Sequence, residues 1–170
     1  KMSFSSNGTT WTSAENYSET KEWTFPSGDG AKKVYVKFQD NRGRWSSVTS
    51  VTVTLDTVKP TGSININSGA TETDSLSVTL NLSATDNASG VCQMSFSTNG
   101  TTWSTAEAYQ TTKSYVLPSG DGRKTVYVRY YDTAGNVSAV YSKAIILDVT
   151  PPAIVIDVET PSLINAKTMM

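Results

Sequence analysis

The chain contains an internal repeat. Residues 2–56 align without a gap to residues 94–148, at a constant offset of 92 positions, and more than half of the aligned residues are identical. The matched segments begin MSFSSNGTTW and MSFSTNGTTW, and both contain PSGDG and Val-Tyr-Val. A unit of this length is too long for one turn of a solenoid and has the size of a small domain. The chain is therefore expected to consist of successive copies of one domain.

Proline-containing linkers set the frame of the repeat. The segments Asp56-Thr-Val-Lys-Pro60 and Asp148-Val-Thr-Pro-Pro152 occupy equivalent positions. We therefore expect residues 1–56 to form the C-terminal part of one unit, residues 57–148 a complete unit, and residues 149–170 the N-terminal strand of a further unit. In this frame the chain is a segment of a longer tandem array. The alternative is an assembling subunit, in which the tail of one copy completes the first unit of its neighbour by strand complementation.

The sequence pattern predicts β-strands throughout the complete unit. Residues 124–131 alternate, with Val126, Val128 and Tyr130 on one face, and such a period of two is typical of a half-buried strand. Turn residues separate the apolar runs, and Asn99-Gly100 is typical of a type I′ hairpin. The predicted strands cover residues 63–67, 76–84, 91–97, 101–104, 113–117, 124–131 and 137–147. Short strands at this spacing predict an all-β sandwich of two sheets, without helices.

Residues 117–138 and the linkers carry a family resemblance. The first run contains Leu-Pro at 117–118, Val-Tyr-Val-Arg-Tyr at 126–130 and Asp-Thr-Ala-Gly-Asn-Val-Ser at 132–138, and Leu-Asp-x-x-x-Pro recurs at 55–60 and 147–152. These segments resemble the ends of fibronectin type III and of bacterial or archaeal immunoglobulin-like modules. The resemblance implies tandem Ig-like or fibronectin III-like β-sandwich domains joined by short Pro-containing linkers. It also implies strings of such modules in extracellular proteins of the cell surface.

Composition excludes several classes of function. The net charge of −1 gives no electrostatic reason to expect nucleic acid as a partner. No apolar run is long enough to span a bilayer as a helix. Histidine, the commonest general base, is absent, and the single cysteine, Cys92, cannot form an intrachain disulfide. No nucleophile elbow or phosphate-binding loop occurs, so no catalytic residue is predicted and the chain is not expected to be an enzyme.

Four aspartates occur in recurring turn and linker contexts: Asp56, Asp86, Asp132 and Asp148. They are candidate calcium ligands, because Ca²⁺ binds several oxygen atoms, which loops at a domain junction can supply. The alternative is that each aspartate caps its own turn by accepting hydrogen bonds from nearby backbone N–H groups, as we also expect of Asp121 in Gly-Asp-Gly. Because no dense Asp-x-Asp-x-Asp run is present, the prediction is no bound cofactor, with calcium as the alternative.

Aromatic residues and sequons indicate two further kinds of candidate site. Trp103, Tyr109 and Tyr115 are candidates for a surface on which sugar rings stack; the alternative is that they pack in the sandwich core. Asn-x-Ser/Thr sequons are candidates for N-glycosylation, and several of them fall in predicted surface turns. The sequons are at Asn7, Asn16, Asn81, Asn87, Asn99 and Asn136.

These observations predict a non-catalytic structural module of an extracellular stalk, fibre, filament or surface-layer protein. Its expected partners are neighbouring repeats of the same protein or other copies of itself. One alternative is an adhesin or carbohydrate-binding module, whose partner is a carbohydrate or a cell surface. The other is a filament subunit that assembles by strand complementation between copies.

Overall fold

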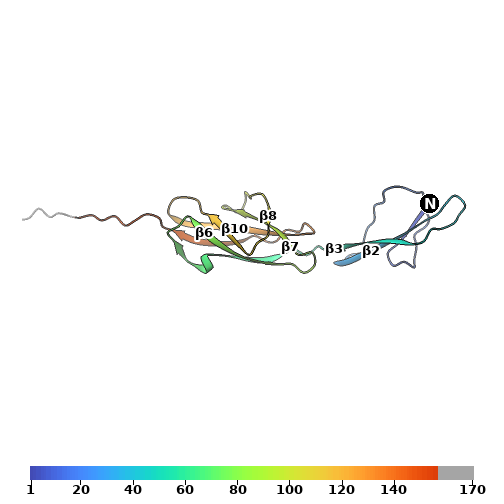
Figure 1. Ribbon diagram of the computed structural model, residues 1–170, viewed down its shortest axis with the longest axis horizontal. Helices are drawn as coiled ribbons and strands as arrows, with labels where there is room; N and C mark the ends of the chain where they lie inside the picture. Colours follow the sequence, from blue (N-terminus) through green and yellow to red (C-terminus); the bar gives the residue numbers. More distant parts are fainter. Residues whose placement is uncertain (157–170) are drawn as a thin grey trace, which may run out of the picture.

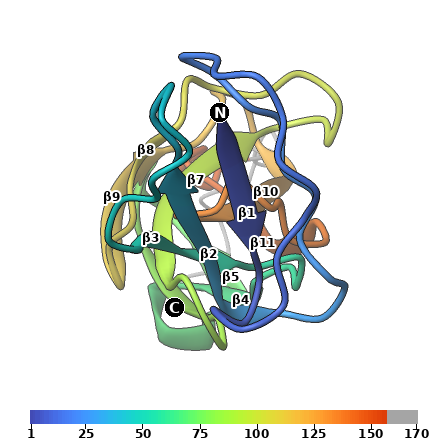
Figure 2. The same cartoon turned by 90° about the vertical axis from the view of Figure 1, so that its right-hand side faces the viewer.

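The computed structural model describes residues 1–156, which form two groups of β-strands placed end to end along a long axis (Figure 1). Residues 61–147 form a sandwich of two sheets, and residues 2–55 contribute a single sheet of three strands. Seen along the long axis, this single sheet lies in front of the sandwich (Figure 2). Within the described residues the one helical element is the short 3₁₀ turn η1 (Asn67–Gly69), so no helix there is long and apolar enough to cross a membrane.

The sandwich consists of a five-stranded and a three-stranded sheet. The strand order is β5-β11-β10-β7-β8 in the first sheet and β4-β6-β9 in the second. Neighbouring strands are antiparallel except β11 and β5, which are parallel. The strands are β4 (Thr61–Ile66), β5 (Glu72–Thr73), β6 (Ser77–Thr85), β7 (Val91–Ser97), β8 (Glu107–Ala108), β9 (Thr112–Val116), β10 (Gly122–Asp132) and β11 (Tyr141–Leu147). The predicted two-sheet sandwich is confirmed.

Strand β10 lies at the centre of the five-stranded sheet and pairs with β7 on one side and β11 on the other. Val126, Val128 and Tyr130 are fully buried, whereas the residues between them are only half-buried. Branched and aromatic side chains pack well on a pleated surface that is buried on one side. The alternation in the sequence therefore determines which face of β10 meets the core, as predicted.

The core lies between the two sheets. The three-stranded sheet contributes the buried side chains of Ile64, Ile66, Val78, Leu80 and Leu82. The five-stranded sheet contributes those of Met94, Phe96, Val126, Val128, Tyr130, Ile145 and Leu147. Full burial of an aliphatic or aromatic side chain stabilises a fold by about 1.5–3 kcal/mol. Packing of the two inner faces is therefore the main source of stability for residues 61–147.

Gly62 permits the close approach of β4 to the ring of Tyr130. A Cβ atom at position 62 would lie 2.7 Å from the carbonyl oxygen of Ser83 and would overlap the Tyr130 ring. Real Cβ atoms do not come this close to a carbonyl oxygen or to an aromatic ring. The lack of a side chain at this position is therefore a packing requirement rather than a turn requirement.

The strands β1 (Met2–Ser5), β2 (Gly30–Phe38) and β3 (Thr49–Leu55) form the N-terminal sheet, in the order β1-β2-β3. Its register repeats that of the sandwich, because Phe4 pairs with Val36 as Phe96 pairs with Val128. Within residues 1–156 no second sheet covers it, so side chains equivalent to core residues stay exposed. Val53, the counterpart of Ile145, is 42% exposed, and Phe38, the counterpart of Tyr130, is 39% exposed.

The segment after β7 is a loop, and the predicted strand over residues 101–104 and the type I′ turn are both wrong. Gly100 has a φ of 75°, but Asn99 has no positive φ, as a type I′ turn would need. Instead, Asn99 Oδ1 accepts hydrogen bonds from the backbone N–H groups of Thr101 (2.9 Å) and Thr102 (2.8 Å). The Asn99 side chain thus accepts the hydrogen bonds that a neighbouring strand would otherwise accept from these N–H groups.

Residues 148–156 form no strand, contrary to the strand expected at the start of residues 149–170. Ile154 and Val155 are each 87% exposed, so no buried face holds them in register with a sheet. The remainder of that expected strand lies outside the described residues. The unit boundaries 1–56, 57–148 and 149–170 stay predictions.

Candidate functional site

Three of the four candidate calcium ligands lie together at the end of the sandwich that meets the linker. Asp56 begins the linker, Asp86 follows β6, and Asp132 is the last residue of β10. One carboxylate oxygen from each of the three lies within 4.8 Å of the other two. Asp148 does not join them, because it follows β11 at the opposite end of the sandwich, where the chain leaves it (Figure 1).

Asp56 is held by both the linker and the sandwich. Its Oδ1 accepts a hydrogen bond from the Val58 N–H (3.1 Å), and its Oδ2 accepts one from the Ser89 N–H (3.0 Å). Its backbone carbonyl oxygen accepts a hydrogen bond of 3.0 Å from Nδ2 of Asn136. Asp56 therefore does more than cap its own turn, since it joins the linker to two loops of the sandwich.

The carboxylate of Asp86 has one oxygen rich in hydrogen bonds and one with none. Oδ2 accepts from the N–H groups of Ala88 (3.0 Å), Ser89 (3.0 Å) and Gly90 (2.9 Å). The Ala88 N–H is the main cause that lowers the pKa of Asp86, against the opposing effect of desolvation. Oδ1 is buried and has no hydrogen-bond partner among the described residues. Such an oxygen carries an unrelieved cost of desolvation.

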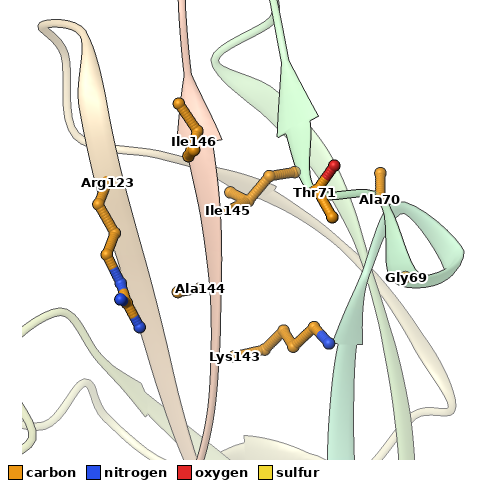
Figure 3. Close-up of a pocket in the computed structure, with 8 residues that line it drawn as sticks. All are labelled: Gly69, Ala70, Thr71, Arg123, Lys143, Ala144, Ile145 and Ile146. Atoms are coloured by element: carbon orange, nitrogen blue, oxygen red, sulfur yellow. The ribbon is translucent and has the colours of Figure 1, made fainter.

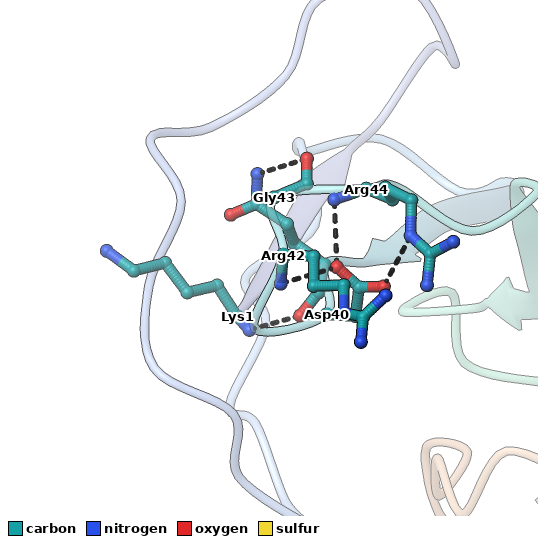
Figure 4. Close-up of polar contacts among 6 residues, drawn as sticks. Lys1, Asp40, Arg42, Gly43 and Arg44 are labelled. Atoms are coloured by element: carbon teal, nitrogen blue, oxygen red, sulfur yellow. Dashed lines mark hydrogen bonds and ion pairs between the residues drawn. The ribbon is translucent and has the colours of Figure 1, made fainter.

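Asp132 and its counterpart Asp40 in the N-terminal segment differ in how their charge is balanced. Asp132 accepts hydrogen bonds from the backbone N–H (2.8 Å) and the side-chain Nδ2 (2.9 Å) of Asn136, which is uncharged. Asp40 accepts from the backbone N–H of Arg44 and forms an ion pair of 2.9 Å with its Nε (Figure 4). These contacts with Arg44, its backbone N–H first, lower the pKa of Asp40.

The three clustered carboxylates have no basic partner among the described residues. The ion pairs found in residues 1–156 involve Glu15, Asp40 and Glu107, and none involves Asp56, Asp86 or Asp132. Asp132 is 2% exposed and Asp56 is 6% exposed. Buried carboxylates of like charge repel one another, because water screens them poorly there.

The linker is also held from the side of the N-terminal sheet. Asp29 Oδ1 accepts hydrogen bonds from the backbone N–H (3.0 Å) and the hydroxyl group (2.8 Å) of Thr57. The same contact recurs after β11, where Asp121 accepts from the Val149 N–H (2.8 Å) and the Thr150 hydroxyl group. The expectation that Asp121 caps its own turn is therefore wrong. The signal in the sequence was the repeat itself, because both Gly-Asp-Gly corners precede a linker at the same spacing.

The three candidate sugar-binding aromatics do not form one surface. The hydroxyl group of Tyr109 accepts a hydrogen bond of 2.9 Å from the Ala84 N–H, and its ring packs edge-on against Tyr130. Tyr109 is therefore a structural residue. Trp103 and Tyr115 instead line an open groove of about 610 Å³, together with Phe96 and the ion-paired side chains of Glu107 and Lys113.

Among the six sequon asparagines, Asn136 is the one whose Nδ2 donates short hydrogen bonds to described residues. Nδ2 is the atom to which an N-glycan is attached, and in Asn136 it donates to the Asp56 carbonyl oxygen and to Asp132 Oδ2. In the folded chain this nitrogen is therefore engaged at the junction. Asn99, in contrast, is exposed, and its Nδ2 makes only a long contact of 3.5 Å with the Thr102 hydroxyl oxygen. Glycosylation stays a prediction.

A further cavity, of about 270 Å³, lies beside β11 and contains none of the candidate residues (Figure 3). It is lined by the 69–71 turn, by Lys143, Ala144, Ile145 and Ile146 of β11, and by Arg123 of β10. Figure 3 shows the side chain of Arg123 extending along β10, whereas that of Lys143 extends sideways from β11 across the cavity. The cavity lies apart from the acidic cluster and has no carboxylate in its lining.

Comparison with solved structures identifies the fold. The chain is similar to the fibronectin(III)-like modules of CbhA from Clostridium thermocellum, with a TM-score of 0.50 and 19% identity over 86% of this chain and 76% of that one. It is also similar to the PKD1 domain of Epp from Vibrio anguillarum, with a TM-score of 0.42 and 17% identity over 56% of this chain and 100% of that one. No family model and no curated protein sequence matches the chain.

The fold is therefore that of an immunoglobulin-like or fibronectin III-like β-sandwich, as the sequence resemblance implied. At this level of identity the likeness establishes the fold alone, because such folds carry many unrelated functions. The role of the chain depends on its own residues, above all on those of the junction around Asp56.

Proposed function

We propose that the chain is a non-catalytic structural module, a stiff spacer in an extracellular stalk, fibre, filament or surface-layer protein. Its partners would be neighbouring repeats of the same protein. The proposal rests on the way in which the linker between two repeats is held, rather than on any cavity.

The supporting observation is that the linker over residues 56–60 is fixed from both ends. Asp29 binds Thr57 from the N-terminal side, and Ser89 and Asn136 bind Asp56 from the sandwich side. Pro60 is fully buried, which places the last linker residue in the packed end of the sandwich. A linker of five residues that is held by such contacts restricts bending between the units it joins, whereas a free linker of the same length would act as a hinge.

Small-angle X-ray scattering of the chain tests this role. We expect an elongated particle with one narrow distribution of distances between the N-terminal sheet and the sandwich. The paired substitutions Asp29→Ala and Asn136→Ala should broaden that distribution, and the exposed Asp74→Ala should leave it unchanged. A broad distribution in the unsubstituted chain would contradict the role of a stiff spacer.

A second candidate function is carbohydrate binding, and the groove beside Trp103 and Tyr115 favours it. Its lining combines aromatic rings with the hydroxyl groups of Ser97, Thr102 and Ser104, which suits a neutral sugar. Titration with neutral oligosaccharides, followed by isothermal titration calorimetry, is the direct test. Trp103→Ala should abolish saturable binding, and Tyr109→Phe should preserve it. Unchanged binding in Trp103→Ala would reject this groove.

The uncovered face of the N-terminal sheet favours a third candidate, a filament subunit completed by strands of another copy. Val51 is 57% exposed and Val53 is 42% exposed on a face whose counterpart in the sandwich is a core. Concentration-dependent association, measured by sedimentation velocity, would support this candidate. Val53→Asp should then abolish the association, and a monomer at all concentrations would reject it.

A further inference from the structure

We propose that Asp56, Asp86 and Asp132 bind a divalent cation, with Ca²⁺ the ion that fits best, and that this ion fastens the linker to the sandwich. The inference deepens the structural role proposed above, because it names what stiffens the junction. It rests on four properties of the three carboxylates: their spacing, their burial, an oxygen without a partner, and the segments from which they come.

The spacing of the carboxylates suits a single ion. Their ligand oxygens lie within 4.8 Å of one another. Ca²⁺ binds oxygen at about 2.3–2.6 Å, so two oxygens on opposite sides of it are about 4.6–5.2 Å apart. All three oxygens are therefore close enough together to bond to the same ion. Ca²⁺ also accepts irregular sets of carboxylate, carbonyl and water ligands, whereas Mg²⁺ requires a regular octahedron.

A nearby positive charge would stabilise these buried carboxylates. Asp56 and Asp132 are nine-tenths or more buried, and no lysine or arginine in residues 1–156 forms an ion pair with any of the three. The chain itself shows the alternative solution at the position equivalent to Asp132, where Asp40 is paired with Arg44. Asn136 stands in place of that arginine, so the charge of Asp132 stays uncompensated by the protein.

The free oxygen of Asp86 is an independent indication of a ligand. Its Oδ1 is buried without a hydrogen-bond partner, although Oδ2 of the same carboxylate accepts three N–H groups. Burial of an unpaired carboxylate oxygen is costly, and a bound cation removes that cost. The three N–H groups fix the direction of the carboxylate, which leaves Oδ1 available to an ion.

The three ligands come from distant parts of the sequence, so a bound ion would tie these parts together. Asp56 belongs to the linker, whereas Asp86 and Asp132 belong to two loops of the following sandwich. A cation that binds all three stabilises the docked linker relative to a detached one. Its effect would thus be on the junction rather than on the sandwich core.

The test is a titration of the metal-free chain with CaCl₂, followed by ¹⁵N–¹H spectra. We expect saturable shifts of the Ser89 and Asn136 amide signals, with a Kd of about 10⁻⁴–10⁻³ M, the range of extracellular calcium modules. Asp86→Asn should weaken binding about tenfold or more, because the site loses a charged ligand. Asp40→Asn, at the counterpart of Asp132 that lies outside the cluster, should leave Kd unchanged. Thermal unfolding should occur at a higher temperature with Ca²⁺ than with chelator, and Asp86→Asn should reduce this difference.

A second variant keeps the test decisive if Asp86→Asn is poorly folded. Asn136→Arg reproduces the Asp40–Arg44 pair and should abolish calcium binding while the chain stays folded. The proposal is overturned if the folded chain shows no saturable shifts up to about 10 mM Ca²⁺, well above the expected Kd. It is also overturned if Asp86→Asn and Asn136→Arg both bind as the unsubstituted chain does.

The outcome is separate from that of the proposed spacer role. A chain that binds no ion but keeps one narrow distance distribution in scattering would reject the cation and retain the spacer. A chain that binds Ca²⁺ but shows a broad distribution with and without the ion would retain the site and reject the spacer.

Discussion

The hydroxyl group of Tyr130 donates a hydrogen bond of 2.6 Å to the backbone carbonyl oxygen of Ser63, and this bond joins the two sheets of the sandwich. The ring of Tyr130 is fully buried and packs against the rings of Tyr109 and Tyr141, at centroid distances of 5.8 Å and 6.0 Å. The equivalent residue in the N-terminal sheet is Phe38, which has no hydroxyl group. The inter-sheet bond is therefore a feature of the sandwich that the repeat does not preserve.

Removal of this hydroxyl group should weaken the sandwich. We expect Tyr130→Phe to lower the free energy of unfolding by about 1 kcal/mol, since a buried acceptor loses one partner while the packing of the ring is kept. Urea denaturation measures the change. Tyr141→Phe is the control, because the Tyr141 hydroxyl group forms no hydrogen bond with the described residues, and it should cost less. Equal losses in the two variants would contradict a role of the Ser63 contact.

The same tyrosine should make the sandwich sensitive to high pH. Burial, and then the charges of Tyr109 and Tyr141, raise the pKa of Tyr130 above the ordinary value of 10.0. The neutral phenol therefore favours the folded state, a contribution fully present below pH 10 and lost as the pH rises through the folded-state pKa. The melting temperature should therefore fall as the pH rises above about 10, and less so in Tyr130→Phe. The same fall in both proteins would refute this origin.

Gly62→Ala should be strongly destabilising because of the close approach between β4 and Tyr130. The new methyl group would lie 2.7 Å from the Ser83 carbonyl oxygen. We expect a loss of about 3 kcal/mol or more, as for other overpacked positions. Gly120→Ala is the comparison, since its φ of 84° gives backbone strain but its surroundings are open. Its cost should be about 1–2 kcal/mol, and a larger cost than that of Gly62→Ala would overturn the steric argument.

The Asp121 contact with the second linker should be lost in acid. The Thr150 hydroxyl group, followed by the Val149 N–H, lowers the pKa of Asp121 below the ordinary value of 3.8. A lowered pKa means that the contribution is present above pH 3.8 and is lost as the pH falls through the folded-state value. The Val149 amide shift should therefore titrate with a midpoint below pH 3.8 and should not titrate in Asp121→Asn. A midpoint at or above 3.8 would show that the contact does not form.

The uncovered N-terminal sheet should accept strands β4 and β6 of the complete repeat. We expect a chain in which residues 57–93 are fused directly to Met2 to form a second sandwich, because residue 93 is equivalent to residue 1. Phe38 and Val53 would then be buried as Tyr130 and Ile145 are. Amide hydrogen exchange in β2 should slow in the fusion relative to the original chain. Unchanged exchange would indicate that the two repeats have diverged too far to share a core.

Most strands were predictable because their alternation is determined by burial on one face. The prediction for residues 91–97 coincides with β7, and that for residues 124–131 lies within β10. The error at residues 101–104 arose because side-chain hydrogen bonds of Asn99, rather than a backbone ladder, determine the path of that loop. A sequence pattern indicates the period of a strand well, but it does not indicate side-chain hydrogen bonds that compete with strand pairing.

The acidic cluster was only half predictable. Asp56, Asp86 and Asp132 were candidates from their recurring contexts, but their convergence depends on the path of the linker into the sandwich. Asp148 has the same context as Asp56, yet it lies at the far end of the sandwich, after β11. The hydrogen bond from Asn136 to the Asp56 carbonyl oxygen could not be predicted from the sequence, because the two residues are 80 positions apart.

The parallel pairing of β5 with β11 has a mechanical consequence. The chain enters the sandwich at one end through the linker and leaves it at the other after β11 (Figure 1). Tension along the long axis would therefore pull β11 lengthwise past β5, so that the hydrogen bonds from Ile146 to Thr71 and from Asp148 to Thr73 are loaded together. Bonds loaded in shear must break at the same moment, whereas bonds loaded by peeling break one after another. The short parallel pairing of β5 with β11 would thus help the sandwich to resist stretching.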